Sequence, residues 1–283
     1  MNSFLKGSLS VVTIAAAGLV TLSSANAGGL LDRGMRGSMK DAPRVQYSGG
    51  VSRCYIRGDV GYSVSGGPSA EMDSPNYATV DMSNMDMGNA WMGEIGAGCG
   101  SGSRGFRADL TLGYRGERDI DGNKPAVATP APVSGVHFPA TLSSKVSTLT
   151  AMANFYYDFG KVRGFVPYVG AGIGVARHKL SSVSFDFAGF AATNPVETIG
   201  GSTQTNFAWS LMAGAAYQIS DRAVLDFGYR YIDMGDVSTR GNICNTCVVG
   251  GSQDRLNIDD ITAHEFKVGL RIHFSGRRAQ TYK

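Results

Sequence analysis

The chain has 283 residues, of which 39 are glycine, 43% are hydrophobic and 17% are charged, and its formal net charge is +3. A balance so close to neutral argues against nucleic acid or a strongly anionic partner. No apolar stretch after the first thirty residues is long enough to form a membrane helix. Length and composition instead fit one large all-β domain.

The amino terminus has the layout of a secretory signal peptide. Lys6 precedes an apolar run over residues 9–22, and a Ser-Ala-Asn-Ala sequence follows at 24–27. We therefore expect residues 1–27 to be removed after Ala27, with export through the inner membrane of a bacterium. Residues 28–51 place arginines among glycines without usable periodicity, which predicts a periplasmic extension.

Eight later segments alternate apolar and polar residues, which is the period of a β-strand with two different faces. In the last of them, Phe266, Val268 and Leu270 alternate with residues such as Lys267 and Arg271. The predicted strands are residues 52–64, 91–100, 106–115, 147–159, 165–176, 205–219, 225–231 and 262–274.

The connections between these segments alternate in length, being long after the first strand, short after the second, and so on to the seventh. An up-and-down barrel with periplasmic turns on one rim and extracellular loops on the other requires this alternation. We predict an all-β fold, an eight-stranded antiparallel transmembrane β-barrel over residues 52–274, whose apolar faces contact lipid. A soluble lipocalin-type barrel is the alternative, but its interior would be apolar, whereas the inner faces here carry charges.

Five motifs carry a family resemblance: MKDAP at 39–43, CYIRGDVGYS at 54–63, NFYYDFG at 154–160, PYVGAGIGVA at 167–176 and HEFKVGLRIHF at 264–274. With them the chain resembles the small outer-membrane β-barrel proteins of alphaproteobacteria, a porin family that includes the major outer-membrane proteins of Brucella. It resembles the transmembrane domain of OmpA more distantly. The resemblance implies an integral protein in the outer membrane of a Gram-negative bacterium.

The resemblance also implies partners. They are outer-membrane lipid and lipopolysaccharide, periplasmic chaperones, and the barrel-insertion machinery, for which Phe274 is the insertion signal. Such proteins usually stop at the terminal aromatic residue, whereas residues 275–283 follow it here and are expected to form a periplasmic tail. The sequence indicates no second globular domain of the kind that binds peptidoglycan in full-length OmpA proteins.

The inward faces of the predicted strands include five basic and five acidic residues assigned to a charge network. These are Arg57, Arg107, Arg230, Lys267 and Arg271, with Asp59, Glu94, Asp109, Asp226 and Glu265. An eight-stranded barrel is about wide enough for its own side chains, and an unpaired charge inside it is costly. We therefore expect a neutralising network that closes the lumen. A narrow channel is the alternative, since Gly170, Gly172 and Gly174 leave room on one inner wall.

Cys54 and Cys99 lie on the same predicted face, near the periplasmic ends of neighbouring strands, where a simple hairpin register pairs them. They form either a disulfide in the oxidising periplasm or two free small apolar side chains. Cys244 and Cys247 make a lone CxxC in the fourth loop. Because no second pair or nearby histidine accompanies it, a local disulfide is favoured over a metal site.

The sequence indicates no catalytic constellation, cofactor site or metal site. The histidines are scattered, with His137 and His178 in or near loops, His264 facing outward and His273 facing inward at the periplasmic end. Met82, Met85 and Met87 have the side chains of a soft-metal site, but they fit an extracellular loop better.

We expect a non-enzymatic outer-membrane barrel that supports the envelope and presents its loops at the cell surface. Loops are where such a barrel meets host molecules or phage. A narrow porin for ions or small solutes and a loop-mediated adhesin are the competing interpretations.

Overall fold

The computed structural model describes residues 54–74, 77–101, 104–125, 127–128, 136–137, 139–187, 197–239 and 255–274. The predicted signal peptide, amino-terminal extension, Cys244–Cys247 pair and carboxy-terminal tail lie outside these residues. Within the described ranges, no helix is long and apolar enough to cross a membrane.

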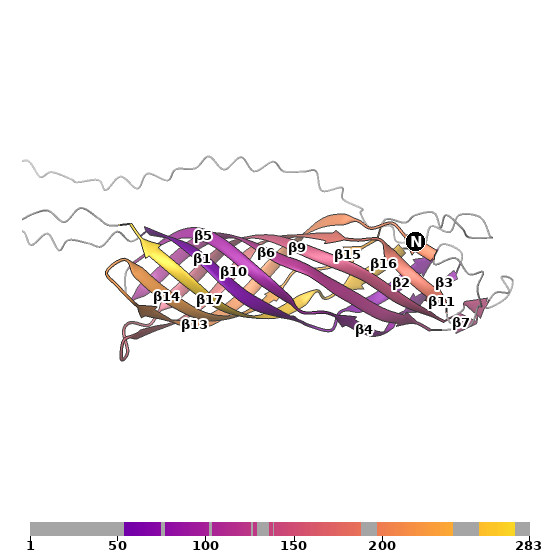
Figure 1. The fold of residues 1–283 in the computed structure, drawn as a ribbon, viewed down its shortest axis with the longest axis horizontal. Coiled ribbons are helices and arrows are strands. Elements are labelled where there is room, and N and C mark those ends of the chain that lie inside the picture. Colours follow the sequence, from indigo (N-terminus) through magenta and orange to yellow (C-terminus); the bar gives the residue numbers. More distant parts are fainter. Residues whose placement is uncertain are drawn as a thin grey trace, which may run out of the picture. The chain divides into compact units, whose positions relative to one another are not determined.

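Eight long strands form a closed antiparallel barrel, as the sequence predicted (Figure 1). They are β1 (Cys54–Ser65), β5 (Ala90–Gly100), β6 (Gly105–Lys124), β9 (Ala140–Asp158), β10 (Phe165–Leu180), β13 (Thr203–Gln218), β14 (Ala223–Asp233) and β17 (Thr262–His273). Each pairs with the next along the chain, and β1 pairs with β17, which closes the ring.

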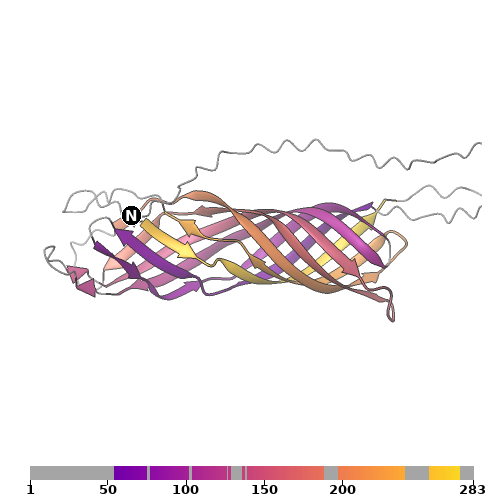
Figure 2. The same ribbon diagram turned by 180° about the vertical axis from the view of Figure 1, so that it is seen from behind.

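The short and long connections alternate as predicted. The short ones, at residues 101–104, 159–164 and 219–222, lie at one end of the barrel, and the long ones lie at the other. Seen from behind, the strands cross the barrel axis obliquely (Figure 2), as the tilt of a closed barrel requires. Short turns mark the periplasmic end of such barrels, and long connections mark the extracellular end.

The long connections contain further strands, where the sequence predicted mainly loops. A four-stranded sheet contains β15 (Val237–Ser238), β16 (Arg255–Asp259), β2 (Ser69–Ser74) and β3 (Tyr77–Asp81). β4 (Ser83–Met87) pairs with β6, and β11 (Val183–Phe187) pairs with β9 and β12 (Glu197–Ile199). β7 (Val127–Ala128) and β8 (Val136–His137) form a small hairpin. In Figure 1, the labels of β2, β3, β4, β7, β11 and β16 gather at the extracellular end of the barrel.

Three strands extend well beyond their predicted ends, and β10 is one of them, continuing to residue 180 rather than 176. β6 continues to residue 124 rather than 115, and β9 begins at residue 140 rather than 147. The reason is visible in the sequence of β6, where the outward side chains change from Tyr114 to Glu117, Asp119 and Asp121. A β-bulge interrupts the β6–β9 register between Arg115 and Arg118 at this change.

This change divides the barrel into two sections along its axis. On β6 the outward side chains are apolar over residues 106–114, and on β9 over residues 149–157. We call the part with the apolar outer face the membrane section, because an outward apolar band is how a barrel contacts lipid. The extracellular section is the part beyond it: residues 116–124, 140–147 and 177–180 of the long strands, and the short strands β2, β3, β4, β11, β12, β15 and β16.

Aromatic side chains pair on the outer face of the membrane section. Ring centroids are 5.3 Å apart for Tyr62 and Trp91, 5.1 Å for Phe106 and Tyr157, and 5.6 Å for Trp209 and Tyr231. Phe106 and Trp91 expose 77% and 75% of their surface. So many exposed aromatic side chains on one face are stable only where that face contacts lipid.

The interior of the extracellular section is an apolar core, which is the reverse of a membrane barrel. Its buried members include Met72, Met82, Met87, Ile120, Leu142, Val146, Leu180, Val183, Phe185, Leu256 and Ile258. Fully burying one such side chain contributes about 1.5–3 kcal/mol. The short strands therefore cover the open end of the barrel as part of one packed core.

Candidate functional site: the charge network of the lumen

The ten charges predicted to line the lumen are all buried inside the membrane section. The most exposed of them, Lys267, shows only 7% of its surface. The charges come from β1, β5, β6, β14 and β17, whose alternation turns every second side chain inward. They form two adjoining clusters, one nearer the periplasmic end and one nearer the extracellular section.

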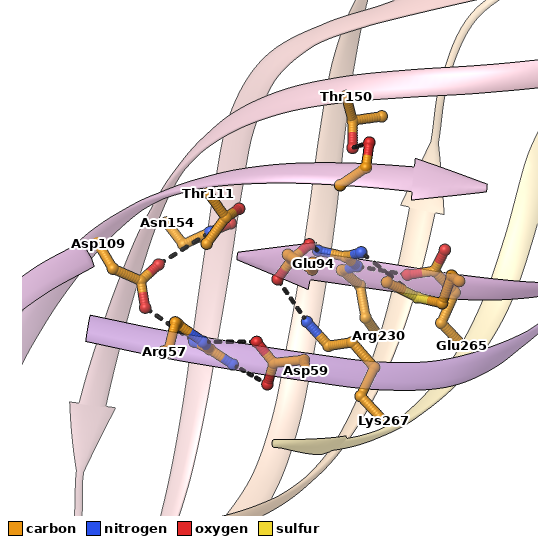
Figure 3. Close-up of polar contacts among 12 residues, drawn as sticks. Arg57, Asp59, Glu94, Asp109, Thr111, Thr150, Asn154, Arg230, Glu265 and Lys267 are labelled. Carbon is orange, nitrogen blue, oxygen red and sulfur yellow. Dashed lines mark hydrogen bonds and ion pairs between the residues drawn. The ribbon is translucent and has the colours of Figure 1, made fainter. Parts of the chain in front are cut away.

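The periplasmic cluster is centred on Arg57. Its guanidinium donates two hydrogen bonds to Asp59, at 2.8 and 2.7 Å, and one to Asp109 at 2.8 Å. Asp109 also accepts from the Tyr55 hydroxyl at 3.1 Å and from the Asn154 amide at 3.0 Å. Figure 3 shows Arg57 between its two carboxylates. These charge-assisted bonds hold both carboxylates in fixed positions.

Arg107 and Arg271 complete this cluster. Arg107 donates to both oxygens of Asp158, at 3.2 and 3.3 Å, and its guanidinium carbon lies 3.9 Å from the ring centre of Tyr156. Arg271 pairs with Asp226. The sequence predicted an inward Asp158 but did not assign it to the network; its place two residues after Tyr156 on the same face was the available signal.

The second cluster is a continuous chain of ion pairs. Glu94 binds Lys267 at 3.1 Å and Arg230 at 2.7 Å (Figure 3). Arg230 in turn donates to Glu265 at 2.6 Å, and the second Glu265 oxygen accepts from Arg115 at 2.6 Å. Arg115 was missing from the predicted set, although its alternation with Leu112 and Tyr114 places it inward.

The glycine-lined wall does not leave an open space. A Cβ added at Gly170 would lie 2.5 Å from Tyr156 Cδ1, and one at Gly172 would lie 2.3 Å from Asn154 Oδ1. At Gly174 it would meet the β9 backbone and the sulfur of Met152. The three glycines therefore make room for large side chains of the neighbouring strand, which fill the lumen.

Cys54 and Cys99 are joined by a disulfide at the periplasmic end of β1 and β5. They are direct cross-strand partners, with Cα atoms 3.9 Å apart. Phe274, the predicted insertion signal, exposes 52% of its surface and donates its backbone N–H to the carbonyl of Cys54 at 3.1 Å. The disulfide thus links β1 to β5, and the Phe274 hydrogen bond extends the pairing of the first and last strands, β1 and β17.

His178, expected in or near a loop, lies on β10 two residues before the strand ends at Leu180. It is fully buried, and its Nε2–H donates to the carbonyl of Met234 at 3.0 Å and its Nδ1 accepts from the Thr148 hydroxyl at 2.9 Å. The exposed Arg177 and Lys179 on either side of it place it in the extracellular section, beyond the apolar band. Burial lowers the pKa of His178 to about 4, so the ring is neutral at physiological pH.

The methionines of the first long connection pack inside the molecule. Met82 and Met87 belong to the apolar core and Met85 packs against it. Across the described part of the chain, no group of three or more His, Cys, Asp or Glu side chains is placed to hold a metal ion. The structure therefore gives these methionines a packing role.

Comparison with known proteins places this architecture in a family. Residues 15–274 match the model of the outer membrane protein beta-barrel domain. The chain belongs to this family. It is an integral protein of the outer membrane of a Gram-negative bacterium, surrounded by lipid and lipopolysaccharide, and its long connections are presented at the cell surface.

Relatives of this family member come from several bacteria. The chain is 36% identical to the outer membrane protein PagN of Salmonella typhimurium, over 48% of this chain and 53% of PagN, so the match spans about half of that relative. It is 31% identical to an uncharacterised protein of Brucella melitensis over 78% of this chain and 84% of the relative. A putative adhesin of Rickettsia bellii is 30% identical, over 65% and 75%.

Solved structures with similar folds include OprG of Pseudomonas aeruginosa, at 14% identity and a TM-score of 0.46, covering 80% of this chain and 98% of OprG. Neisserial surface protein A has 17% identity and a TM-score of 0.40, covering 80% and 99%. Outer membrane barrels of this kind are mostly non-enzymatic, although the protease OmpT is also among the structural neighbours.

Proposed function

We propose that the protein is a closed, non-enzymatic barrel that supports the outer membrane and carries a rigid surface domain. The observation that supports this most is the order of two barriers along one axis. The ion-paired lumen of the membrane section is followed by the apolar core of the extracellular section. A solute crossing the barrel would have to open both.

Opening the first barrier is costly because its charges are buried together. Removing one partner from a buried ion pair costs about 3–5 kcal/mol, and Glu94 and Glu265 each hold two basic partners. Opening the second barrier exposes apolar side chains to water, at about 25 cal/mol per Å². A narrow porin would need both events in every conducting state, so we favour the closed barrel.

The outer wall supports contact with lipopolysaccharide phosphates. Arg177 and Lys179 follow Val175 on the outward face of β10, immediately beyond the apolar band, and both are exposed. Cations at that level face the headgroup region, where anionic lipid groups lie. Insertion by the barrel-insertion machinery, with Phe274 as its signal and periplasmic chaperones as carriers, completes the proposed envelope role.

Adhesion is the second candidate function. The observation in its favour is that the extracellular section has its own apolar core. This core holds the connections between its strands in fixed positions, where a host or phage ligand could bind. The similarity to a Rickettsia protein named a putative adhesin also supports adhesion as a candidate function. Cells displaying the wild-type protein should then bind host cells or matrix, and cells displaying a chain shortened in residues 240–250 should bind less.

Single-channel conductance of the refolded mature protein in planar bilayers tests the closed barrel. We expect a silent wild type and only infrequent openings in Glu94→Ala, which leaves Arg230 and Lys267 short of a carboxylate but keeps the apolar core of the extracellular section intact. Asp119→Asn, which removes an exposed ion pair to Lys145, is the matched control and should stay silent. Discrete openings of the wild type would support the porin instead.

A further inference from the structure

The basic and acidic side chains of the lumen are not evenly matched along the axis. Among the described residues, the periplasmic cluster has three basic side chains and four carboxylates: Arg57, Arg107 and Arg271 with Asp59, Asp109, Asp158 and Asp226. The cluster next to the extracellular section has four basic side chains and two carboxylates: Arg115, Arg118, Arg230 and Lys267 with Glu94 and Glu265. The ion pairs of this second cluster therefore leave basic side chains in excess near the boundary between the two sections.

Arg118 is the clearest source of this excess. It is 1% exposed, and it donates hydrogen bonds to two neutral hydroxyls, Ser65 Oγ at 2.9 Å and Thr148 Oγ1 at 3.2 Å. No carboxylate within the described ranges forms an ion pair with it. A buried guanidinium without a counter-charge is among the costliest groups a protein can hold.

Three buried polar atoms of Arg118 and its neighbours have no hydrogen-bond partner in the described part of the chain. They are Arg118 Nε, Arg115 Nη2 and Ser63 Oγ. Arg115 is fully buried, as is Ser63. Both guanidinium atoms are obligatory donors, and the serine hydroxyl can donate as well. Each of the three atoms can therefore donate a hydrogen bond to an acceptor.

The strand pairing and the hydrogen bonds place these three side chains at neighbouring levels of the lumen. Ser63 is the direct cross-strand partner of Glu265, which accepts the Nε–H of Arg115. Ser65, two residues farther along β1, accepts from Arg118. On the opposite wall the two arginines contact successive inward residues of β9, with Arg115 donating to Thr150 and Arg118 to Thr148. Ser63 thus lies close along the barrel axis to Glu265 and Ser65, the residues that accept hydrogen bonds from the two guanidinium groups.

We propose that this boundary is a binding site for one small monovalent anion of the halide class, held by Arg115, Arg118 and Ser63. Such an anion accepts from all three donors and offsets part of the excess positive charge. A water molecule satisfies hydrogen bonds but supplies no charge. The apolar core above the site, which includes Ile120 and Val146, excludes the bulk water that would otherwise screen the arginines.

Crystals of the refolded protein grown or soaked in sodium bromide test the site directly, because bromide scatters anomalously and takes the place of chloride. We expect an anomalous peak between the Arg115 and Arg118 guanidinium groups of the wild type. We also expect chloride to raise the thermal unfolding midpoint relative to gluconate at equal ionic strength. No bromide peak in crystals with both arginines ordered would overturn the proposal.

Ser63→Asp supplies an internal carboxylate in place of the anion and is the sharpest variant. The bromide peak and the chloride dependence should both disappear, while the heat-modifiable gel migration of the folded barrel is kept. A bromide peak that persists in Ser63→Asp would overturn the assignment. If Ser63→Asp does not refold, Arg118→Met removes the unmatched charge and must abolish the peak; its survival there would also overturn the site.

Discussion

The membrane section and the extracellular section use the same strands with opposite rules. On β6, Leu110 faces outward with 68% of its surface exposed while Asp109 is buried; farther along, Asp121 faces outward and Ile120 is fully buried. The membrane section is thus apolar outside and ionic inside, and the extracellular section is polar outside and apolar inside. The solvent on the outer face decides which pattern is stable.

The contrast teaches how each section resists opening. Ion pairs such as Arg230–Glu265 are directional, so the loss of one partner leaves a buried charge behind. Apolar contacts such as those of Leu142 are lost in proportion to the cavity that a substitution leaves. We therefore expect the two sections to respond differently to substitution, pH and lipid.

The largest expected effect comes from breaking the membrane section at Glu265, whose two oxygens hold Arg115 and Arg230. Glu265→Gln keeps the shape but removes the charge, and should lower the free energy of unfolding by about 3–5 kcal/mol. Heat-modifiable migration and urea unfolding of the refolded barrel in detergent measure it. Asp119→Asn, at an exposed ion pair, should change it by less than about 1 kcal/mol. If the two substitutions lowered the free energy of unfolding equally, the buried ion pairs of the membrane section would not be its main source of stability.

Leu142→Ala breaks the extracellular section instead. Leu142 is 1% exposed, and its truncation should cost about 2–5 kcal/mol in the opening of that section. Hydrogen exchange should report faster exchange in β6, β9 and β11 near residue 142. Leu149→Ala on the same strand, with 49% of its surface facing lipid, is the control and should leave exchange there unchanged. Faster exchange throughout the membrane section would show that the two sections open together.

Arginine substitutions on the outward face of β6 compare the outer surface of the membrane section with that of the extracellular section. Leu110→Arg puts a charge into the apolar band and should cost about 2–4 kcal/mol. Asp121→Arg, on the same face in the extracellular section, should stay within about 0.5 kcal/mol, since it also removes a carboxylate from opposite Asp86. Refolding yield and urea midpoints in lipid vesicles measure both. A tolerated Leu110→Arg would contradict the position of the band.

Acidification should weaken the extracellular section through His178. Its pKa is about 4 in the folded protein against an ordinary value of 6.5, so the contribution is full above pH 6.5. As pH falls from 6.5 to 4 the unfolded chain takes up a proton that the folded chain refuses, which costs up to about 3 kcal/mol. Hydrogen exchange of the segments around Thr148 and Met234 follows the loss.

His178→Gln provides the control for this pH dependence. Its amide can still donate to the carbonyl of Met234 but does not titrate. The variant should therefore show a flatter pH dependence between 6.5 and 4 in the extracellular section. An equally steep dependence in wild type and variant would assign the effect to groups other than His178.

Much of the barrel could be predicted because its rules are local. Alternation along each strand identified eight spans and their inward charges, and connection lengths gave the order of the turns. The same alternation also contained Arg115 and Asp158, which lie next to predicted members on the inner face. Their partners could not be predicted, because Arg115 meets Glu265 across 150 residues of sequence.

The sequence by itself determined the barrel, its inner and outer faces and its membrane-facing surface, because strand period and apolar pattern are properties of neighbouring residues. Only the tertiary structure decided that β6 and β9 continue past the membrane, since their patterns reverse at the bulge after Arg115. It also decided that side chains of β9 occupy the space beside Gly170, Gly172 and Gly174. Both outcomes depend on which distant strands pack together, and packing is set by the closed ring as a whole.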